Sequence, residues 1–355
     1  MRNTLTFLFI LSALLFTCSC KKDTRQASSQ TENNAKQVLS YIKSLGYLDE
    51  HIVDNGKEYI VEGDILFSKS MKVPSKSSSK IANTEQYYNG TLVNLLHQFT
   101  ISVSIDPSMV SQNNEINDAV NLWNGVSGDF VGFTVVPSGG AIVVTAAPAG
   151  ATYCGSAGFP AGGLPFNQVL VNIPVVAGQS YAQRMINVAH ELGHCIGFRH
   201  TNGDGGVFGT PVPGWGGTDG SSIMNGNSCG VLSTVLSAKD IGAVRALYPI
   251  PVSPQNVQVT IGASAFSVNW SSASSVPGDA LVGYTVNYNG FSGTGFGGSV
   301  PVSTSTFSYV IPGANPSAPG TSKYIRVSID ARYASGAVYG STLVSWFNSG
   351  SGWHQ

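Results

Sequence analysis

The run His190-Glu191-Leu192-Gly193-His194-Cys195-Ile196-Gly197-Phe198-Arg199-His200 decides the fold of the central part of the chain. His190 and His194 are one helical turn apart, so both imidazoles lie on one face of a helix. Gly197 can adopt φ > 0, which lets the chain reverse and bring His200 round as a third ligand. Three histidines leave one tetrahedral position on zinc open for water, as in catalytic sites. Glu191 is rotated by about 100° from His190 and is suited to take a proton from that water.

The residues before this run predict the helix that carries it. Ser180 followed by Gln183 forms a capping box, after which apolar residues recur at helical spacing. These apolar positions are Met185, Val188, Ala189, Leu192 and Ile196. We therefore expect a helix over residues 180–196.

The extended motif HExxHxxGxxH is the pattern of the metzincin metalloendopeptidases, which also carry a methionine turn below the zinc. Ser222-Ile223-Met224-Asn225 resembles that turn, with Met224 as its methionine. The stretches HELGHCIGFRHT, GTP, TDGSSIMN and LYP make residues 40–250 similar to the bacterial HEIGH-type dual-action metallopeptidases. The resemblance implies an α+β metzincin-like catalytic domain, a twisted sheet plus the active-site helix, that cleaves proteins or peptides with Zn2+. Gly226 stands where astacins place a tyrosine ligand, so no tyrosine switch is expected.

The composition of the chain excludes several classes of function. The 355 residues are enough for two domains, charged residues make up 10 %, glycines number 42 and the net charge is −1. This balance gives no electrostatic basis for binding nucleic acid or anionic membranes. The sequence also lacks the G-x-x-x-x-G-K-[ST] pattern of P-loop nucleotide-binding proteins. A protein or peptide substrate is the expected partner, and the oligomeric state is left open.

Residues 1–20 predict export. Arg2 precedes an apolar run, Leu5–Phe16, which is too short to span a membrane and is typical of a signal peptide. Its end resembles the lipoprotein signals of Bacteroidetes-like bacteria, with Cys20 as the acylated residue. The alternative is Cys18, which has a leucine, Leu15, three positions before it. We expect a lipoprotein at the bacterial outer membrane or cell surface that meets the membrane only through its lipid. Simple signal cleavage and secretion is the alternative.

The exported chain retains three cysteines, Cys154, Cys195 and Cys229. An oxidising compartment permits one disulfide among them and leaves one free thiol. The sequence favours no particular pair.

Residues 21–80 are predicted to form a tether and an inhibitory propeptide. The predicted elements are a polar tether over Lys21–Asn34, a helix over Ala35–Leu45 and strands over Tyr59–Val61 and Ile65–Phe67. Ser68–Lys80, with the lysines Lys69, Lys72, Lys76 and Lys80, predicts an exposed activation loop that a trypsin-like enzyme would cut.

Val61-Glu62-Gly63-Asp64-Ile65 is similar to the Phe-Glu-Gly-Asp-Ile stretch of astacin propeptides, whose aspartate sits on the catalytic zinc. The resemblance implies that Asp64 is a metal ligand in the latent form only. A carboxylate is a good zinc ligand, and Gly63 lets the backbone approach closely. The alternative is an ordinary turn between two strands, because Gly-Asp is a common turn pair. No cysteine lies between Lys21 and Tyr153, which excludes a thiol switch.

The zinc metallopeptidase domain is expected over residues 81–250. Its predicted elements are strands over Phe99–Ile105, Phe133–Val136, Ile142–Ala146 and Val169–Ile173, a helix over Asn113–Asn124 and a last helix after a capping box at Ser237–Asp240. The resemblance implies that Thr152–Pro160 is the exposed sheet edge on which an extended substrate lies. Asp204 and Asp219 are expected in turns rather than as calcium ligands.

Residues 253–350 predict an antiparallel β-sandwich, because short strands alternate with Gly/Pro/Ser turns. Phe266, Val268 and Trp270 alternate along one strand, and a tryptophan on an early strand resembles a fibronectin type III-like module. We expect its aromatic residues in the core rather than on a carbohydrate-binding face. The alternative to a peptidase is a surface-attached binding or adhesion protein in which the peptidase fold is a platform. The intact ligand set and Glu191 argue against that alternative.

Overall fold

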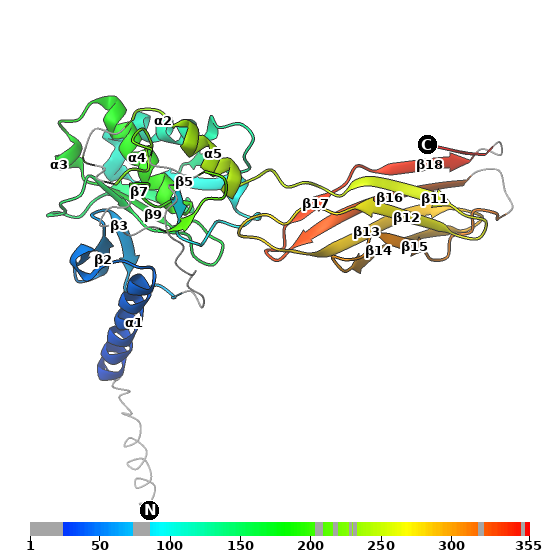
Figure 1. Cartoon of the computed structure of the whole chain (residues 1–355), viewed down its shortest axis with the longest axis horizontal. Helices are drawn as coiled ribbons and strands as arrows, with labels where there is room; N and C mark the ends of the chain where they lie inside the picture. Colours follow the sequence, from blue (N-terminus) through cyan, green and yellow to red (C-terminus); the bar gives the residue numbers. More distant parts are fainter. Residues whose placement is uncertain are drawn as a thin grey trace, which may run out of the picture.

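The computed structural model describes residues 24–73, 86–202, 209–215, 219–226, 229, 233–318, 323–348 and 352–355. Figure 1 shows three parts in chain order: an N-terminal helix with a small antiparallel unit, a domain of sheet and helices, and an elongated β-domain. Cys18, Cys20 and residues 74–80 of the expected activation loop lie outside the described residues. Within the described ranges, no helix combines the length and the apolar character that crossing a bilayer requires.

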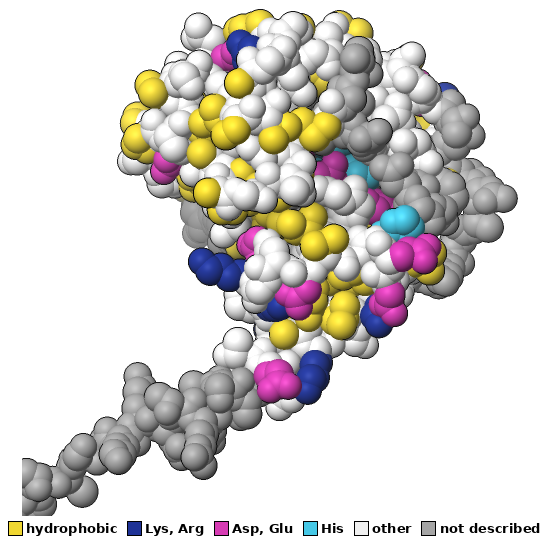
Figure 2. Space-filling model, turned by 90° about the vertical axis from the view of Figure 1, so that its left-hand side faces the viewer, with side chains coloured by type: hydrophobic (Ala, Val, Ile, Leu, Met, Phe, Trp, Pro, Cys, Tyr) yellow, Lys and Arg dark blue, Asp and Glu magenta, His cyan; other side chains and the backbone are white. Residues whose placement is uncertain are grey.

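The first part, residues 24–73, is called the N-terminal segment below. Its elements are α1 (Thr24–Ser44), the 3-10 helix η1 (Asp49–His51), β1 (Ile52–Asp54), β2 (Glu58–Val61) and β3 (Ile65–Ser68). The two strands predicted around Gly63 are therefore present. Figure 2 shows that charged side chains on this face of the molecule gather on the N-terminal segment, whereas the domain above it displays few.

The tether expected over Lys21–Asn34 is wrong from Thr24 onward, because α1 already begins there. Val38 and Ile42 anchor the later turns of α1 in a core, and once those turns exist each further residue adds a hydrogen bond at little cost. The i,i+4 pair of Glu32 and Lys36, 2.9 Å apart, supports the exposed turns. The described residues Thr31, Glu32 and Asn33 are exposed, so an apolar pattern cannot reveal these turns.

A mixed eight-stranded sheet forms the second part, and the N-terminal segment supplies three of its strands. Its order is β1-β2-β3-β8-β9-β7-β5-β6. The remaining strands are β5 (Ile101–Ile105), β6 (Phe133–Val136), β7 (Ile142–Ala146), β8 (Gly155–Ala157) and β9 (Gln168–Val171). Strands β5, β6, β7 and β9 run parallel, whereas β8 is antiparallel to β9. β5 begins two residues later than predicted, after the 3-10 helix η2 (Gln98–Thr100), and Ile173 belongs to the short helix α3 (Ile173–Val176) rather than to β9.

Helices cover this sheet and enclose its apolar core. They are η3 (Pro107–Gln112), α2 (Asn113–Asn124), α4 (Tyr181–Cys195) and α5 (Ala238–Leu247), and a small ribbon pairs β4 (Tyr87–Tyr88) with β10 (Thr210–Pro211). The predicted bounds of α2 are confirmed, with Ile116, Val120 and Trp123 buried on its inner face. The indole Nε1 of Trp123 donates to the Ala189 carbonyl at 2.8 Å, which ties α2 to α4.

The third part is all-β. Its strands are β11 (Gln255–Ile261), β12 (Phe266–Ser271), β13 (Leu281–Phe291), β14 (Gly295–Val302), β15 (Ser308–Ile311), β16 (Lys323–Tyr333), β17 (Val338–Gly340), β18 (Val344–Asn348) and β19 (Trp353–His354). One sheet has the order β11-β12-β15 and the other β14-β13-β16-β18-β19, with β17 beside β16. Phe266, Trp270 and Tyr284 are at most 5 % exposed, so these aromatic side chains lie in the core as expected.

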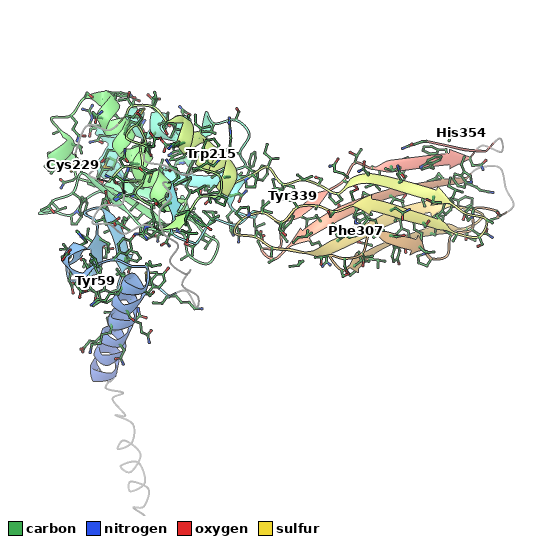
Figure 3. All side chains as sticks on the ribbon, in the orientation of Figure 1. Tyr59, Trp215, Cys229, Phe307, Tyr339 and His354 are labelled. Atoms are coloured by element: carbon green, nitrogen blue, oxygen red, sulfur yellow. A yellow bond between two sulfur atoms is a disulfide. The ribbon has the colours of Figure 1, made fainter. Side chains whose placement is uncertain are left out.

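Aromatic and polar contacts join the third part to the second. Tyr339, labelled in Figure 3, lies at the near end of the β-domain, and its ring is 5.6 Å from that of Phe130. The Asp279 carboxylate accepts a hydrogen bond from the Leu95 amide at 3.3 Å.

Candidate metal centre

Helix α4 carries the first two histidines into the interior. Ser180 caps it, since its hydroxyl accepts a hydrogen bond from the Gln183 amide at 3.2 Å. From Ile186 to Cys195 every residue of α4 is buried, and His190 and His194 have 0 % exposure. The apolar neighbours on the same helix therefore fix the direction in which both imidazoles point.

A glycine turn brings His200 to the same place. Gly197 has φ +109°, and a Cβ there would lie 2.7 Å from the Thr91 carbonyl oxygen, so both conformation and space require glycine. The chain then returns along β4, where the Arg199 amide donates to the Tyr87 carbonyl at 2.9 Å. His200, 2 % exposed, follows directly.

The predicted ligands converge on one point. His200 Nε2 lies 3.2 Å from His194 Nε2 and 3.3 Å from His190 Nε2. The Asp64 carboxylate joins them, with Oδ1 3.2 Å from His200 Nε2 and Oδ2 3.6 Å from His190 Nε2. The four ligand atoms all lie within 4.8 Å of one another, so the structure brings together the complete predicted set.

Backbone acceptors orient two of the rings. His190 Nδ1 lies 2.6 Å from the Ile223 carbonyl and His194 Nδ1 lies 2.7 Å from the Phe198 carbonyl. A carbonyl only accepts, so both Nδ1 atoms donate, which leaves Nε2 of each ring as the atom that can offer a lone pair to a metal ion. Inward lone pairs at this separation repel one another unless a cation lies between them. The donor set of three imidazoles and a carboxylate thus fits a divalent metal ion.

The electrostatics of the cluster favour a bound cation. Burial, and then the neighbouring His190 and His200 rings, lower the pKa of His194 well below its ordinary value. Burial alone would lower the pKa of His200 too, but the carboxylates of Asp64 and Glu62 outweigh it and raise that pKa to about 10. His194 therefore keeps its lone pair free for a metal ion, and the two carboxylates balance positive charge at His200.

Glu191 lies beside the ligands and faces the strand β8. Its side chain has 0 % exposure, and within the described part of the chain its carboxylate oxygens have no hydrogen-bond partner. A Cβ on Gly155 would lie 2.5 Å from Oε1, so glycine on β8 makes the space that this carboxylate occupies. Burial, and then the Asp64 charge, raise the pKa of Glu191 well above its ordinary value. An unpaired buried carboxylate next to a metal centre is suited to proton transfer.

Met224 lies directly beneath α4. It has 0 % exposure, and a Cβ on Gly193 would lie 2.5 Å from its Sδ. The preceding residue, Ile223, accepts the hydrogen bond from His190 described above. Sequence reasoning missed what holds this loop: Asp240 accepts from the Ile223 amide at 3.1 Å and from the Ser222 hydroxyl at 2.5 Å. Its only sequence signal was the capping box of α5, which the structure confirms at Ser237 and Asp240.

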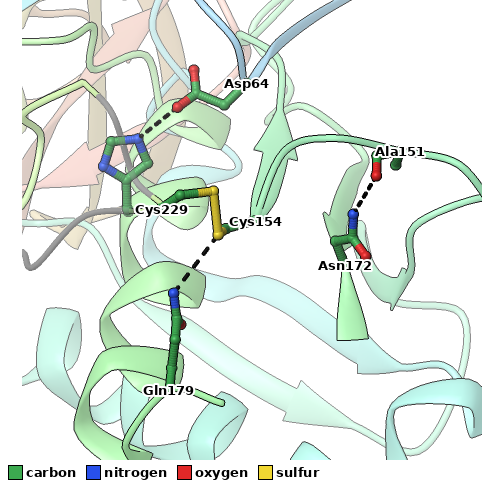
Figure 4. The surroundings of a disulfide bond; sticks show 7 residues. Asp64, Ala151, Cys154, Asn172, Gln179 and Cys229 are labelled. Atoms are coloured by element: carbon green, nitrogen blue, oxygen red, sulfur yellow. Dashed lines mark hydrogen bonds and ion pairs between the residues drawn. A yellow bond between two sulfur atoms is a disulfide. The ribbon is translucent and has the colours of Figure 1, made fainter. Parts of the chain in front are cut away.

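A disulfide joins the residue before β8 to a residue that follows the Met224 turn. Cys154, directly before β8, is bonded to Cys229 (Figure 4). Cys195 is free and buried. The Gln179 amide lies 3.7 Å from the Cys154 sulfur. Asp219 occupies a turn, since it accepts from the Ser221 amide at 3.0 Å, as expected; Asp204 lies outside the described residues.

The expected exposed sheet edge is covered in this structure, which corrects the prediction for Thr152–Pro160. Strand β3 pairs in parallel with β8 through Ile65 and Ala157, and the Ala157 amide donates to the Asp64 carbonyl at 3.1 Å. The Ser156 hydroxyl donates to the same carbonyl. The backbone thus adds a strand where the prediction placed substrate, and the same residue presents its carboxylate to the histidines.

Comparisons with known proteins give the family of the chain. A family profile described as dual-action HEIGH metallo-peptidase matches residues 59–248. The search of curated proteins found no match. Among solved structures, the chain is similar to myroilysin (17 % identity, TM-score 0.33), over 49 % of this chain and 91 % of myroilysin.

Two further similar structures concern smaller parts of the chain. The third fibronectin III domain of the human KIAA0343 protein has 21 % identity and a TM-score of 0.23, over 28 % of this chain and 85 % of that domain. Pectate lyase PelI from Erwinia chrysanthemi has 10 % identity and a TM-score of 0.20, over 26 % of this chain, which spans only 28 % of the lyase. Since the family profile, over residues 59–248, spans more than half of the 355 residues, the chain belongs to the dual-action HEIGH metallopeptidases.

Proposed function

We propose that the chain is an exported zinc endopeptidase of the metzincin type, made as a latent precursor that the N-terminal segment inhibits. The observation that carries the proposal is the convergence of His190, His194 and His200 beside an unpaired Glu191. The three histidines would hold the metal in the active enzyme, with Asp64 as a fourth ligand in the precursor. Three imidazole ligands with one exchangeable position favour zinc among the common divalent ions.

The chain's own residues account for the chemistry of hydrolysis. When bound, zinc acts as a Lewis acid that polarises the scissile carbonyl and lowers the pKa of water. Glu191 takes the proton of the attacking water and passes it to the leaving amine. Its burial keeps competing water away, and Gly155 leaves room for the carboxylate next to the strand where substrate lies. Met224 and Asp240 hold the loop whose carbonyl orients His190.

Strand β8 is the proposed substrate site. Its pairing with β3 supports this, because a strand that accepts the N-terminal segment through main-chain hydrogen bonds can accept an extended peptide in the same way. Recognition through the backbone suits a peptidase acting on many protein sequences.

Latency is supported by the position of Asp64. The carboxylate lies among the ligand histidines and β3 fills the neighbouring edge, so one segment takes both the metal position and the substrate strand. Cleavage would fall in Ser68–Lys80. Lys69 is an unfavourable cleavage site, since its ammonium group contacts Asp54 and the Gly56 carbonyl. Lys72, Lys76 and Lys80 are the remaining candidate cleavage sites.

Export and a lipid at Cys20, or alternatively Cys18, complete the proposal. The disulfide between Cys154 and Cys229 supports an oxidising compartment. The β-domain is proposed to be fibronectin type III-like, because the three-stranded sheet β11-β12-β15 faces the larger sheet that contains β14, β13, β16 and β18.

Casein hydrolysis by the trypsin-processed chain tests the proposal. After the trypsin is blocked with a serine-protease inhibitor, the wild type should cleave casein and lose activity to a zinc chelator. Glu191→Ala should retain zinc and lose activity by roughly 10³-fold or more. His200→Ala should also lose zinc. Near-normal turnover by Glu191→Ala would overturn the mechanism, and a processed wild type without activity would favour the binding protein.

A further inference from the structure

A buried cation lies beside the metal centre and takes no part in the proposed hydrolysis. Arg199 precedes the ligand His200 and is 2 % exposed. Its guanidinium lies over the ring of Tyr47, 4.1 Å from the centroid, and Nη2 is 3.8 Å from Glu62 Oε1. Within the described part of the chain, Nη2 makes no hydrogen bond. Buried arginines are stable only where a carboxylate or another acceptor balances their charge.

The balancing carboxylate comes from the N-terminal segment. Glu62 is a non-glycine residue at φ +52°, a conformation that side chains of L-residues rarely permit. This backbone turns the side chain into the interior, where it is 1 % exposed and Oε2 lies 3.3 Å from His200 Nδ1. Glu62 therefore faces two groups of the catalytic domain, the Arg199 guanidinium and the outer edge of a ligand imidazole.

Two groups that contact the Arg199 guanidinium, Tyr47 and Glu62, lie upstream of the predicted activation loop. Cleavage in that loop and departure of the segment would uncover a guanidinium next to the metal and remove its carboxylate. The Arg199 backbone would stay in place, since its amide bonds to Tyr87 in the catalytic domain. A preformed cationic position of this kind binds carboxylates through charge-assisted hydrogen bonds.

We infer that Arg199 and the Nδ1 edge of His200 form a carboxylate subsite, filled by Glu62 in the precursor and by an acidic substrate side chain in the processed enzyme. The inference rests on the proposed peptidase function and adds a substrate preference to it. Glu62 is two residues before Asp64, whose carboxylate lies among the ligand histidines. The acidic side chain of a substrate therefore belongs within one or two residues of the scissile bond.

Paired peptides test the subsite in the processed enzyme. Quenched, amidated peptides differ only by Glu or Gln at each of the positions flanking the scissile bond, and kcat/KM is measured for each pair. The wild type should prefer Glu by roughly ten- to a hundred-fold at one position. Arg199→Gln removes the charge-assisted contact and should therefore reduce that ratio to below about three. Arg245→Gln, a change at an exposed arginine on α5, should keep the wild-type ratio.

The ratio within each variant is the criterion, so a general loss of rate does not affect it. Cleavage of both peptides at equal rates by the wild type would overturn the subsite while leaving the peptidase intact. Absence of cleavage of every peptide would overturn the proposed function and the subsite with it.

A second measurement needs no protein variant. An amidated peptide of residues 58–68 should inhibit the processed wild-type enzyme, and Glu62→Gln in that peptide should weaken inhibition by roughly ten-fold or more. Glu58→Gln in the same peptide is the matched control and should leave inhibition within about two-fold of the unchanged peptide. Equal inhibition by the unchanged peptide and by the peptide with Glu62→Gln would overturn the inference, even if Arg199→Gln failed to fold.

Discussion

Substitution of Asp64 by alanine should give a full-length precursor that is active without processing. The Asp64 carboxylate is 2 % exposed, and its oxygens lie 3.2 Å from His200 Nε2 and 3.6 Å from His190 Nε2. Removing one partner from a buried ionic contact costs about 3–5 kcal/mol. At about 1.36 kcal/mol per factor of ten, the equilibrium between covered and uncovered cleft shifts by about a hundred- to several thousand-fold.

The variant should still be less active than the processed enzyme, because other contacts of the segment remain. The ring of Phe67 packs edge-on against Phe159 at 5.9 Å, and β3 stays paired with β8. The assay is hydrolysis of fluorescent casein by the purified chain, with intact-mass measurement before and after to show that no processing took place. Asp49→Ala, which removes an exposed carboxylate from the same segment, is the control and should stay silent.

Two results would refute this reasoning. An intact Asp64→Ala chain that holds zinc yet stays as silent as the wild-type precursor would show that the strand pairing alone closes the cleft. Activity that persists after Glu191→Ala is added to Asp64→Ala would show that the hydrolysis comes from a contaminant or from another site.

The other predictions concern the anchor, the disulfide and one half-buried carboxyl group. Cys20→Ser should abolish labelling by a palmitate analogue and release the protein from membranes; loss of label only in Cys18→Ser would assign the lipid to Cys18. Replacing Cys154 and Cys229 by serine removes a cross-link between residues 75 positions apart and should lower the free energy of unfolding by about 4 kcal/mol in urea titrations. Reduction of the wild type with dithiothreitol should cause the same loss. Burial raises the pKa of Asp129 to about 6, so stability falls as pH rises from about 4 to 6, where the folded state holds more protons than the unfolded state. Asp129→Asn should therefore stabilise the fold by about 1 kcal/mol at pH 7, after allowance for solvent screening, and by nearly nothing at pH 4; equal effects at both pH values would contradict the assignment.

Local patterns made most of the metal centre predictable. The spacing of His190 and His194, the apolar face of α4 and the conformational freedom of Gly197 all act within a few residues, so the sequence contains their geometry. The same holds for α2, whose predicted bounds are those of the structure. The roles of Asp240 and Trp123 were missed because each contacts a part of the chain that sequence spacing does not reveal.

Long-range pairing and composition explain what was wrong or missing. The contact between Ser156 and Asp64 joins residues 92 positions apart, so the covered sheet edge could not be predicted from local pattern. Strand β14 cannot be predicted from local pattern, because Gly297, Gly298 and Pro301 have low strand propensity. The strand forms as the outer neighbour of β13, an edge position where proline is tolerated.

The division of the apolar cores explains how the N-terminal segment can be both firmly docked and removable. Among the described residues, its own cluster includes Val38, Ile42 and Phe67 and takes only Phe159 from the catalytic domain. The main core of the catalytic domain, within the same described ranges, includes no residue of the segment. A smaller cluster joins Leu66 of the segment to Tyr153 and Leu170 of the catalytic domain, so loss of the segment uncovers these side chains and Phe159 but not the main core. The two units are joined by these apolar contacts, by the pairing of β3 with β8 and by the carboxylates of Glu62 and Asp64. A peptide substrate with an acidic residue can replace the strand pairing and the Glu62 contact.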